Sequence, residues 1–216
     1  MPYSNFWKIM MKIKICGLTN LEDAEHCEQR GAWALGFNFY PKSPRCISKT
    51  AAKEIINALP KAILKVGIYI NESYDTLLQY IDDLGLDLVQ VYAPLNDAPS
   101  SFKDRVILSL QATTKGDLPP ASILSSYRYV LLDAPKIDND DLLGGTGRRA
   151  NWALAETMAR EYPLILAGGI NATNVRDAIQ AVNPYAVDLA SGVEQTPGIK
   201  DKSQINRLFE ELKHVN

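Results

Sequence analysis

The sequence predicts a single parallel α/β barrel of the (β/α)8 type. Eight short apolar runs of strand length alternate with seven or eight segments of helical periodicity, which is the pattern of βαβ units in a parallel sheet. No linker or shift in composition divides the 216 residues, of which 46% are hydrophobic, so the chain suits one well-buried domain. The last two apolar runs both end in small residues, as expected where two neighbouring strands reach the same end of a barrel.

Each predicted strand is an apolar run that stops at a turn or loop signal. The first, Lys12–Cys16, alternates through Ile13 and Ile15 and stops at Gly17. The other strands are expected at residues 34–39, 65–70, 88–91, 106–110, 129–132, 164–167 and 186–189. The segment 40–46, Y-P-K-S-P-R-C, holds too much proline for regular structure.

Capping residues and helical spacing place the helices between these strands. Asn20, with Asp23 three residues later, opens the first helix as a weak capping box, and Gly31 is a natural C-terminal glycine. Within residues 73–84 an apolar stripe at helical spacing indicates core packing; it consists of Tyr74, Leu77, Leu78 and Ile81. The remaining helices are expected at residues 48–59, 101–105, 121–126, 151–160, 172–182 and 202–212.

An open doubly wound sheet is the alternative architecture. It would normally carry nucleotide-binding glycines after the first strand, whereas K-I-C-G-L-T has a single glycine there. Residues 1–10 precede a second methionine at position 11, and we treat them as an extension outside a barrel domain of residues 11–216.

Composition and charge exclude several classes of protein. A net charge of -2, a pI near 5.7 and the lack of a basic cluster argue against binding nucleic acid or an anionic membrane. No apolar run reaches membrane-spanning length, and M-P-Y-S-N-F-W-K-I-M lacks the features of a secretory signal. We therefore expect a soluble protein of the reducing cytoplasm.

A metal site is not expected. Cys16, Cys27 and Cys46 are odd in number and lack metal-ligand spacing, and His26 and His214 are the two histidines of the chain.

Small residues follow the last two predicted strands. One strand ends at Gly168 and Gly169 before a helical segment, and the next ends at Ser191 and Gly192. Glycine lets the main chain approach an anion, and N–H groups at a helix start bind it. One such pair would be explained by a tight βα turn. Two consecutive pairs favour a phosphate site at the catalytic end of a barrel.

Four polar residues stand at predicted strand ends or in the loops that follow. Cys16 is either a small buried hydrophobe or a thiol that reaches the barrel mouth. Arg45, from its position alone, is interpreted as a solvated surface residue rather than a substrate contact. Asp133 follows four apolar residues, where a carboxylate is costly to desolvate, so it is the best acid candidate. For Asp188 a structural ion pair and a functional role are both open.

Several motifs, in this order and spacing, are highly specific when taken together. They are K-I-C-G-L-T-N at 14–20, G-F-N-F-Y-P-K-S-P-R at 36–45, L-L-D at 131–133, G-G-T-G at 144–147, A-G-G-I-N at 167–171 and V-D-L-A-S-G-V-E-Q-T-P-G at 187–198. From Lys12 to about Leu212 the chain resembles phosphoribosylanthranilate isomerase of tryptophan biosynthesis.

The resemblance implies a TIM barrel and an aldose–ketose isomerase that needs no cofactor or metal. The reaction would be the Amadori rearrangement of N-(5-phosphoribosyl)anthranilate to 1-(2-carboxyphenylamino)-1-deoxyribulose 5-phosphate. Cys16 would be the general base at C2 of the ring-opened imine, and Asp133 the general acid at the ring oxygen. Arg45 would contact the anthranilate carboxylate, and its charge would also favour the Cys16 thiolate.

The resemblance also implies a set of substrate-binding residues. The phosphate would lie on the N–H groups around Gly168, Gly169, Ser191 and Gly192. The rest of the set is Gln90, Tyr92, Asp188 and, in the long loop 133–149, Gly145.

The chain departs from the family pattern near the predicted aromatic pocket. Residues 89–93 read V-Q-V-Y-A where the family commonly has V-Q-L-H-G, so Tyr92 replaces a histidine and Ala93 a glycine. The fifth strand also lacks a lysine often found there. These changes concern how the aromatic ring is held and which ring is preferred.

Three functions are therefore weighed: the isomerase, a divergent paralogue acting on a related aryl-amino sugar phosphate, and a non-catalytic phosphosugar-binding barrel. Indole-glycerol-phosphate synthase would need catalytic lysines, and ribulose-phosphate epimerase metal-binding histidines, that this chain lacks at the expected places. The expected partner is a small phosphorylated substrate, and the protein is expected to be a monomer or a homodimer.

Overall fold

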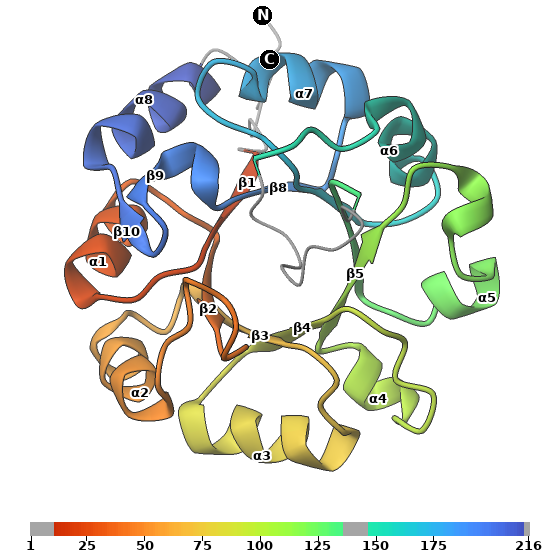
Figure 1. Cartoon of the computed structure of the whole chain (residues 1–216), viewed down its shortest axis with the longest axis horizontal. Coiled ribbons are helices and arrows are strands. Elements are labelled where there is room, and N and C mark those ends of the chain that lie inside the picture. The colour runs from red at the N-terminus through yellow and green to blue at the C-terminus, as the bar shows by residue number, and fades with distance from the viewer. Residues whose placement is uncertain (1–10, 136–146, 214–216) are drawn as a thin grey trace, which may run out of the picture.

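The chain folds into a closed barrel of eight parallel strands in the computed structural model, which describes residues 11–135 and 147–213. The strands follow one another around the barrel in chain order, and β1 closes on β8 with Lys14 opposite Asp188. Figure 1 looks down the barrel, with the strands as an inner ring and the helices as an outer ring. The predicted (β/α)8 barrel is confirmed, and the open sheet is excluded.

The strands are β1 (Lys12–Cys16), β2 (Ala34–Asn38), β3 (Leu64–Tyr69), β4 (Leu88–Val91), β5 (Val106–Gln111), β6 (Tyr129–Asp133), β7 (Leu164–Leu166) and β8 (Ala186–Leu189). The helices are α1 (Leu21–Gln29), α2 (Lys49–Ala58), α3 (Tyr74–Leu84), α4 (Ser100–Lys103), α5 (Ala121–Leu124), α6 (Trp152–Ala159), α7 (Val175–Val182) and α8 (Lys202–Leu212). Most predicted boundaries lie within two residues of these.

The predicted start of α7 at residue 172 is wrong by three residues. The side chains of Asn171 and Asn174 form local turns instead, because Asn171 Oδ1 accepts from Thr173 N at 2.8 Å and Asn174 Oδ1 accepts from Asn171 N at 2.9 Å. Such bonds offer the backbone an alternative to the helix. The helix consequently begins only at Val175.

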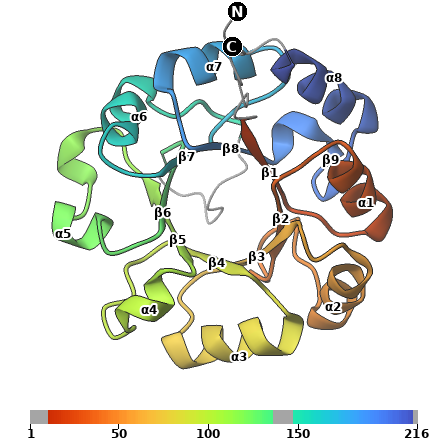
Figure 2. The same cartoon turned by 180° about the vertical axis from the view of Figure 1, so that it is seen from behind.

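A small antiparallel hairpin follows β8 and was not predicted. It consists of β9 (Glu194–Thr196) and β10 (Ile199–Lys200), and it lies between α1 and α8 in both views (Figures 1 and 2). Its turn contains Pro197 and Gly198, the latter at φ 88°, and this Pro-Gly pair was an available turn signal.

Two apolar layers hold the barrel together. The larger lies between strands and helices and includes the α3 stripe, where Leu77 and Ile81 are buried. The smaller fills the barrel interior; its members are Ala34, Val66, Leu88, Ile107, Tyr129, Leu131, Ile165, Ala167 and Ala186. Gln90, Asp133 and Asp188 each follow one of these interior residues by two positions on the same strand, which places them toward the carboxyl ends.

None of the described helices combines the length and the apolar character that crossing a bilayer would require.

Candidate active site

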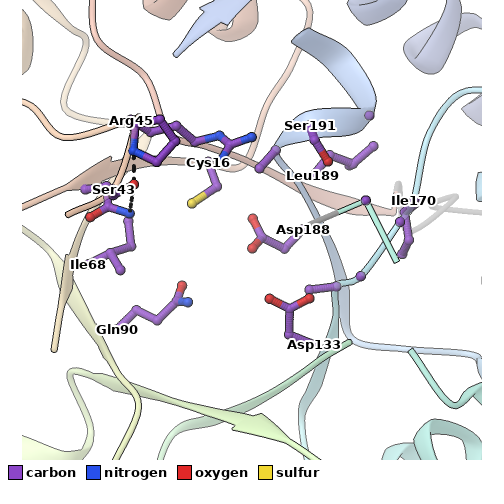
Figure 3. Close-up of a pocket in the computed structure, with 18 of the residues that line it drawn as sticks. Cys16, Ser43, Arg45, Ile68, Gln90, Asp133, Ile170, Asp188, Leu189 and Ser191 are labelled. Atoms are coloured by element: carbon purple, nitrogen blue, oxygen red, sulfur yellow. Dashed lines mark hydrogen bonds between the residues drawn. The ribbon is translucent and has the colours of Figure 1, made fainter. Parts of the chain in front are cut away.

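A pocket opens at the carboxyl ends of the barrel strands. It holds about 750 Å³ of empty space, the open mouth included. In Figure 3 the sulfur of Cys16, the carboxylates of Asp133 and Asp188 and the amide of Gln90 point into it. They come from β1, β6, β8 and β4 and meet because the carboxyl ends of parallel strands share one end of the barrel.

Asp133 is a buried carboxyl group at the pocket wall, with 8% of its surface exposed. Burial raises its pKa from 3.8 to about 6, although the N–H of Ala134 donates to Oδ1 at 2.7 Å and works in the other direction. The charge of Asp188 adds to the rise, and that of Lys14 opposes it. A carboxyl group with such a pKa can carry a proton near neutral pH, as a general acid must.

Cys16 presents a half-buried thiol to the same pocket. Gly36 leaves room for it, because a Cβ there would lie 3.0 Å from the sulfur. Burial raises the pKa of the thiol; the charges of Lys14 and Lys200 lower it, that of Asp188 raises it, and the net shift is upward. The charges that lower the pKa of this thiol come from Lys14 and Lys200. That Arg45 also favours the thiolate stays a prediction.

Lys14 and Asp188 form an ion pair inside the barrel. Lys14 is fully buried, and its Nζ donates to Asp188 Oδ1 at 2.9 Å. Burial alone would lower the pKa of Lys14, but the charges of Asp188 and Cys16 outweigh it and the pKa is raised. The structural ion pair expected for Asp188 is therefore present. Asp188 also lines the pocket, and a functional role for it stays a prediction.

Arg45 is buried, and the interpretation of it as a solvated surface residue is wrong. It is 8% exposed and lines the pocket. Its Nε lies 3.0 Å from Glu194 Oε1 and its Nη2 lies 2.7 Å from Oε2, a bidentate pair. The proline-rich loop turns back on itself, with Arg45 N donating to Ser43 Oγ, and Gly17 lacks the Cβ that would meet the Arg45 stem. The loop thereby carries the side chain inward.

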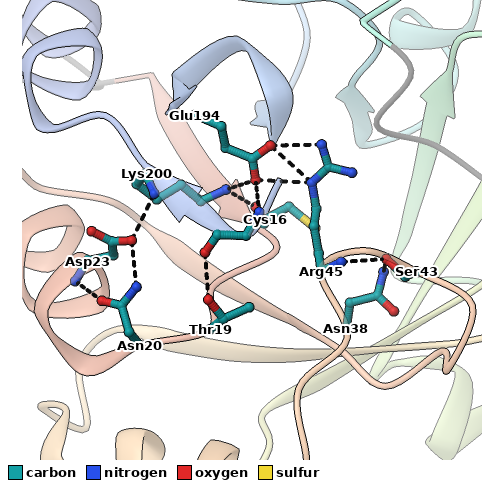
Figure 4. A network of polar contacts seen from close by, with 10 residues as sticks. Cys16, Thr19, Asn20, Asp23, Asn38, Ser43, Arg45, Glu194 and Lys200 are labelled. Carbon is teal, nitrogen blue, oxygen red and sulfur yellow. Dashed lines mark hydrogen bonds and ion pairs between the residues drawn. The ribbon is translucent and has the colours of Figure 1, made fainter. Parts of the chain in front are cut away.

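The carboxylate of Glu194 joins Arg45 to the β9–β10 hairpin (Figure 4). Lys200 Nζ donates to Glu194 Oε1 at 2.7 Å and to the carbonyl oxygen of Cys16 at 2.6 Å. Lys200 N also donates to Asp23 Oδ2 of α1 at 2.8 Å. Burial alone would raise the pKa of Glu194, but the hydrogen bonds from Arg45 and the charge of Lys200 outweigh it, and the pKa is lowered. The hairpin thus holds both the backbone of Cys16 and the guanidinium of Arg45.

Three residues of the site were not predicted from the sequence: Lys14, Glu194 and Lys200. Lys14 had a usable signal, because it lies two positions before Cys16 and must share its face of β1. A lysine inside a barrel needs a carboxylate partner, and Asp188 was available. Glu194 and Lys200 depend on a hairpin that was not predicted.

Small residues after β7 and β8 shape one side of the pocket. Gly168 and Gly169 have φ values of 84° and 63°, which favour glycine, and a Cβ on Gly168 would lie 2.8 Å from Ala134 N. A Cβ on Gly192 would overlap the carbonyl oxygen of Ile170. These glycines and Ser191 all line the pocket. Phosphate binding there stays a prediction.

Gly145 lies outside the described residues. Gly147, in the same G-G-T-G motif, lines the pocket.

Tyr92 places a phenol in the pocket where the family commonly has an imidazole. Burial, together with the charges of Asp133, Cys16 and Asp188, raises its pKa well above 10, so the phenol stays neutral. Gln90 Nε2 lies 3.4 Å from the Tyr92 hydroxyl, whereas Gln90 Oε1 is buried and accepts no hydrogen bond from any residue that the structure describes. A substrate donor would satisfy that oxygen.

Within residues 11–135 and 147–213, no group of three histidine, cysteine or acidic side chains is placed to hold a metal ion. That the chain works without metal or cofactor stays a prediction.

Comparison with known proteins gives consistent matches. A family model described as "N-(5'phosphoribosyl)anthranilate (PRA) isomerase" matches residues 13–211. The N-(5'-phosphoribosyl)anthranilate isomerase of Pelobacter propionicus is 42% identical over 205 residues, covering 93% of this chain and 94% of the relative.

Two solved structures show the same architecture. A phosphoribosyl anthranilate isomerase from Thermus thermophilus aligns with a TM-score of 0.79 at 32% identity, covering 95% of this chain and 100% of the other. A phosphoribosyl anthranilate isomerase in complex with reduced 1-(o-carboxyphenylamino)-1-deoxyribulose 5-phosphate aligns with a TM-score of 0.77 at 35% identity, covering 94% and 99%.

Proposed function

The chain belongs to the N-(5'-phosphoribosyl)anthranilate isomerase family, and from this premise we propose that it catalyses the Amadori rearrangement of N-(5-phosphoribosyl)anthranilate. One observation carries the proposal most directly. The thiol of Cys16 and the high-pKa carboxyl of Asp133 point into one pocket, beside a cradle of glycines. The substrate is thus a small phosphorylated molecule.

The two groups divide the chemistry between them. Asp133 donates its proton to the ring oxygen, the bond from that oxygen to C1 breaks, and the nitrogen lone pair forms the protonated imine. The Cys16 thiolate then removes the proton from C2; the C–H electron pair forms the C1–C2 double bond, and the imine electrons return to nitrogen. Loss of the proton from the C2 hydroxyl and protonation of C1 give the ketone product.

Substrate binding uses the two sides of the pocket. The phosphate lies on the backbone N–H groups around Gly168, Gly169, Ser191 and Gly192. Arg45, oriented by Glu194, contacts the anthranilate carboxylate. Binding energy from these remote ends holds the sugar between acid and base.

The test is turnover of N-(5-phosphoribosyl)anthranilate by the purified chain and three variants. Cys16→Ala and Asp133→Asn are each expected to lose nearly all turnover while they stay folded. Cys46→Ala, which removes an exposed thiol, is the matched control and stays active. A fully active Asp133→Asn would remove Asp133 from the acid role. The chain is also expressed in a tryptophan auxotroph that lacks this step. Growth of that strain without tryptophan would contradict a purely binding role.

A second candidate function is isomerisation of a related aryl-amino sugar phosphate. It is supported by the neutral phenol of Tyr92 in the pocket, where the family commonly has histidine. A panel of ring-altered substrates separates the two. A clear preference for phosphoribosylanthranilate would exclude this candidate.

Other expectations from the sequence stay predictions. These are a domain of residues 11–216 with residues 1–10 as an extension, which lies outside the described residues, a cytoplasmic location, and a monomeric or homodimeric state that sedimentation would measure.

A further inference from the structure

We propose that Lys14 is a positioning residue for this reaction, whose buried ammonium group, held by Asp188, stabilises the thiolate form of Cys16. The inference rests on the proposed function, in which that thiolate takes a proton from carbon. Lys14 does not line the pocket, so it acts through Cys16 and not by touching substrate.

The geometry follows from the barrel. Lys14 and Cys16 are two residues apart on β1, and alternation along a strand turns both side chains to the same face. β1 pairs with β8 so that Lys14 stands opposite Asp188, and Nζ reaches Oδ1 at 2.9 Å. The ammonium group is therefore fixed beside the sulfur by a partner on the neighbouring strand.

Several charged or titratable groups surround this thiol. They are Lys14 on β1, Tyr92 after β4, Asp133 on β6, Asp188 on β8, Lys200 on β10 and Arg45 in the loop after β2. Burial favours the neutral thiol, and the strongest influence against burial is the charge of Lys14. The charge of Asp188 has the next largest effect and raises the pKa of the thiol, and the smaller effect of the Lys200 charge lowers it.

The other two cations near the thiol, Lys200 and Arg45, are paired with Glu194. The ammonium group of Lys200 donates to Glu194 and to the carbonyl oxygen of Cys16. The guanidinium of Arg45 pairs with Glu194. Lys14 is the cation whose carboxylate partner also lines the pocket, so its charge is held where the thiolate forms.

The experiment measures the thiol directly, without substrate. The rate of alkylation of Cys16 by iodoacetamide is followed by peptide mass spectrometry across pH in the full chain and in Lys14→Met. Removal of the charge is expected to raise the thiol pKa by about one unit or more. Turnover at neutral pH should fall about tenfold for each unit, with KM nearly unchanged. The difference from the unmodified chain should disappear only above the raised thiol pKa, where both thiols are ionised.

A matched control is Lys65→Met. Lys65 is another buried strand lysine, on β3, whose Nζ donates to the carbonyl oxygen of Pro60 at 2.8 Å, and it does not line the pocket. Its removal should leave the titration of Cys16 unchanged. An equal shift in this variant would overturn the inference.

A double variant covers the case in which Lys14→Met alone does not fold, since it leaves Asp188 buried without its partner. Lys14→Met/Asp188→Asn removes both charges. Because Lys14 acts on the thiol more strongly than Asp188, the thiol pKa should still be raised. If Lys14 serves only to neutralise Asp188, the double variant will titrate like the unmodified chain, and the inference fails.

The two proposals fail in different ways. An unmodified chain without isomerase activity would overturn the proposed function and would leave the thiol titration interpretable. An active chain whose Cys16 titrates unchanged in Lys14→Met would overturn the inference alone.

Discussion

Replacing Asp133 with asparagine is expected to stabilise the fold near neutral pH even though it removes the proposed acid. Burial raises the pKa of this carboxyl from 3.8 to about 6. Ionising it in the folded protein therefore costs more than ionising it in the unfolded chain. A difference of about two pKa units corresponds to roughly 3 kcal/mol of unfolding free energy.

The sign of the pH dependence follows from that shift. Because the folded pKa lies above the unfolded pKa, the contribution of Asp133 to stability is fully present below 3.8 and is lost as pH rises through about 6. Asparagine does not titrate, and its Oδ1 can still accept from Ala134 N as the carboxylate does at 2.7 Å. The NH₂ group of the asparagine needs hydrogen-bond acceptors in the pocket, and this cost offsets about 1 kcal/mol of the stabilisation. The net gain at pH 8 should be about 2 kcal/mol.

The assay is urea denaturation of both proteins between pH 4 and pH 8, together with turnover. The stability difference should grow as pH rises and level off above pH 7. Asp104→Asn, at an exposed residue after α4, is the control and should show no such growth. A difference that is constant, or that shrinks as pH rises, would refute the reasoning about burial of Asp133.

Three further predictions concern the proposed base, the glycine cradle and the hairpin. The proposed reaction needs Asp133 protonated and Cys16 ionised at the same time; the pKa of Asp133 is about 6 and that of Cys16 is raised from 9.0. Between these two pKa values the gain of thiolate and the loss of protonated Asp133 cancel, so kcat/KM should rise up to about pH 6, stay level and fall only above the pKa of the thiol. A fall between pH 6 and pH 8 in the measured profile would contradict this. Gly192→Ala, whose Cβ would overlap the Ile170 carbonyl oxygen, should raise KM about tenfold in steady-state kinetics. Gly116→Ala, whose Cβ would make an ordinary contact with Thr114 Oγ1 at 3.6 Å, should not. Glu194→Gln should lower the unfolding free energy by about 3 kcal/mol at pH 7, because it breaks a buried ion pair. Since the pKa of Glu194 is lowered from 4.5, that loss should disappear in denaturation experiments as pH falls below 4.5, and a loss that persists there would indicate a packing effect.

Local signals in the sequence were enough for the barrel and for part of the pocket. Alternation and helical spacing depend on residues a few positions apart, so they predict strands and helices without knowledge of the fold. A polar residue at the end of an apolar run is also a local signal, and it marked Cys16 and Asp133 as residues of the barrel mouth. Gly168 and Gly169 were recognised because they follow directly after an apolar run, which is also a local signal. The structure adds that both have positive φ values.

Burial and pairing of charges were decided by the tertiary structure. Lys14 and Asp188 are 174 residues apart in the chain, and only closure of β1 on β8 brings them together. Arg45 looked like a surface residue because its burial depends on Glu194, which is 149 residues away in a hairpin. The physical reason is that a charge can enter the interior only with its partner, and closure of the barrel is what supplies that partner.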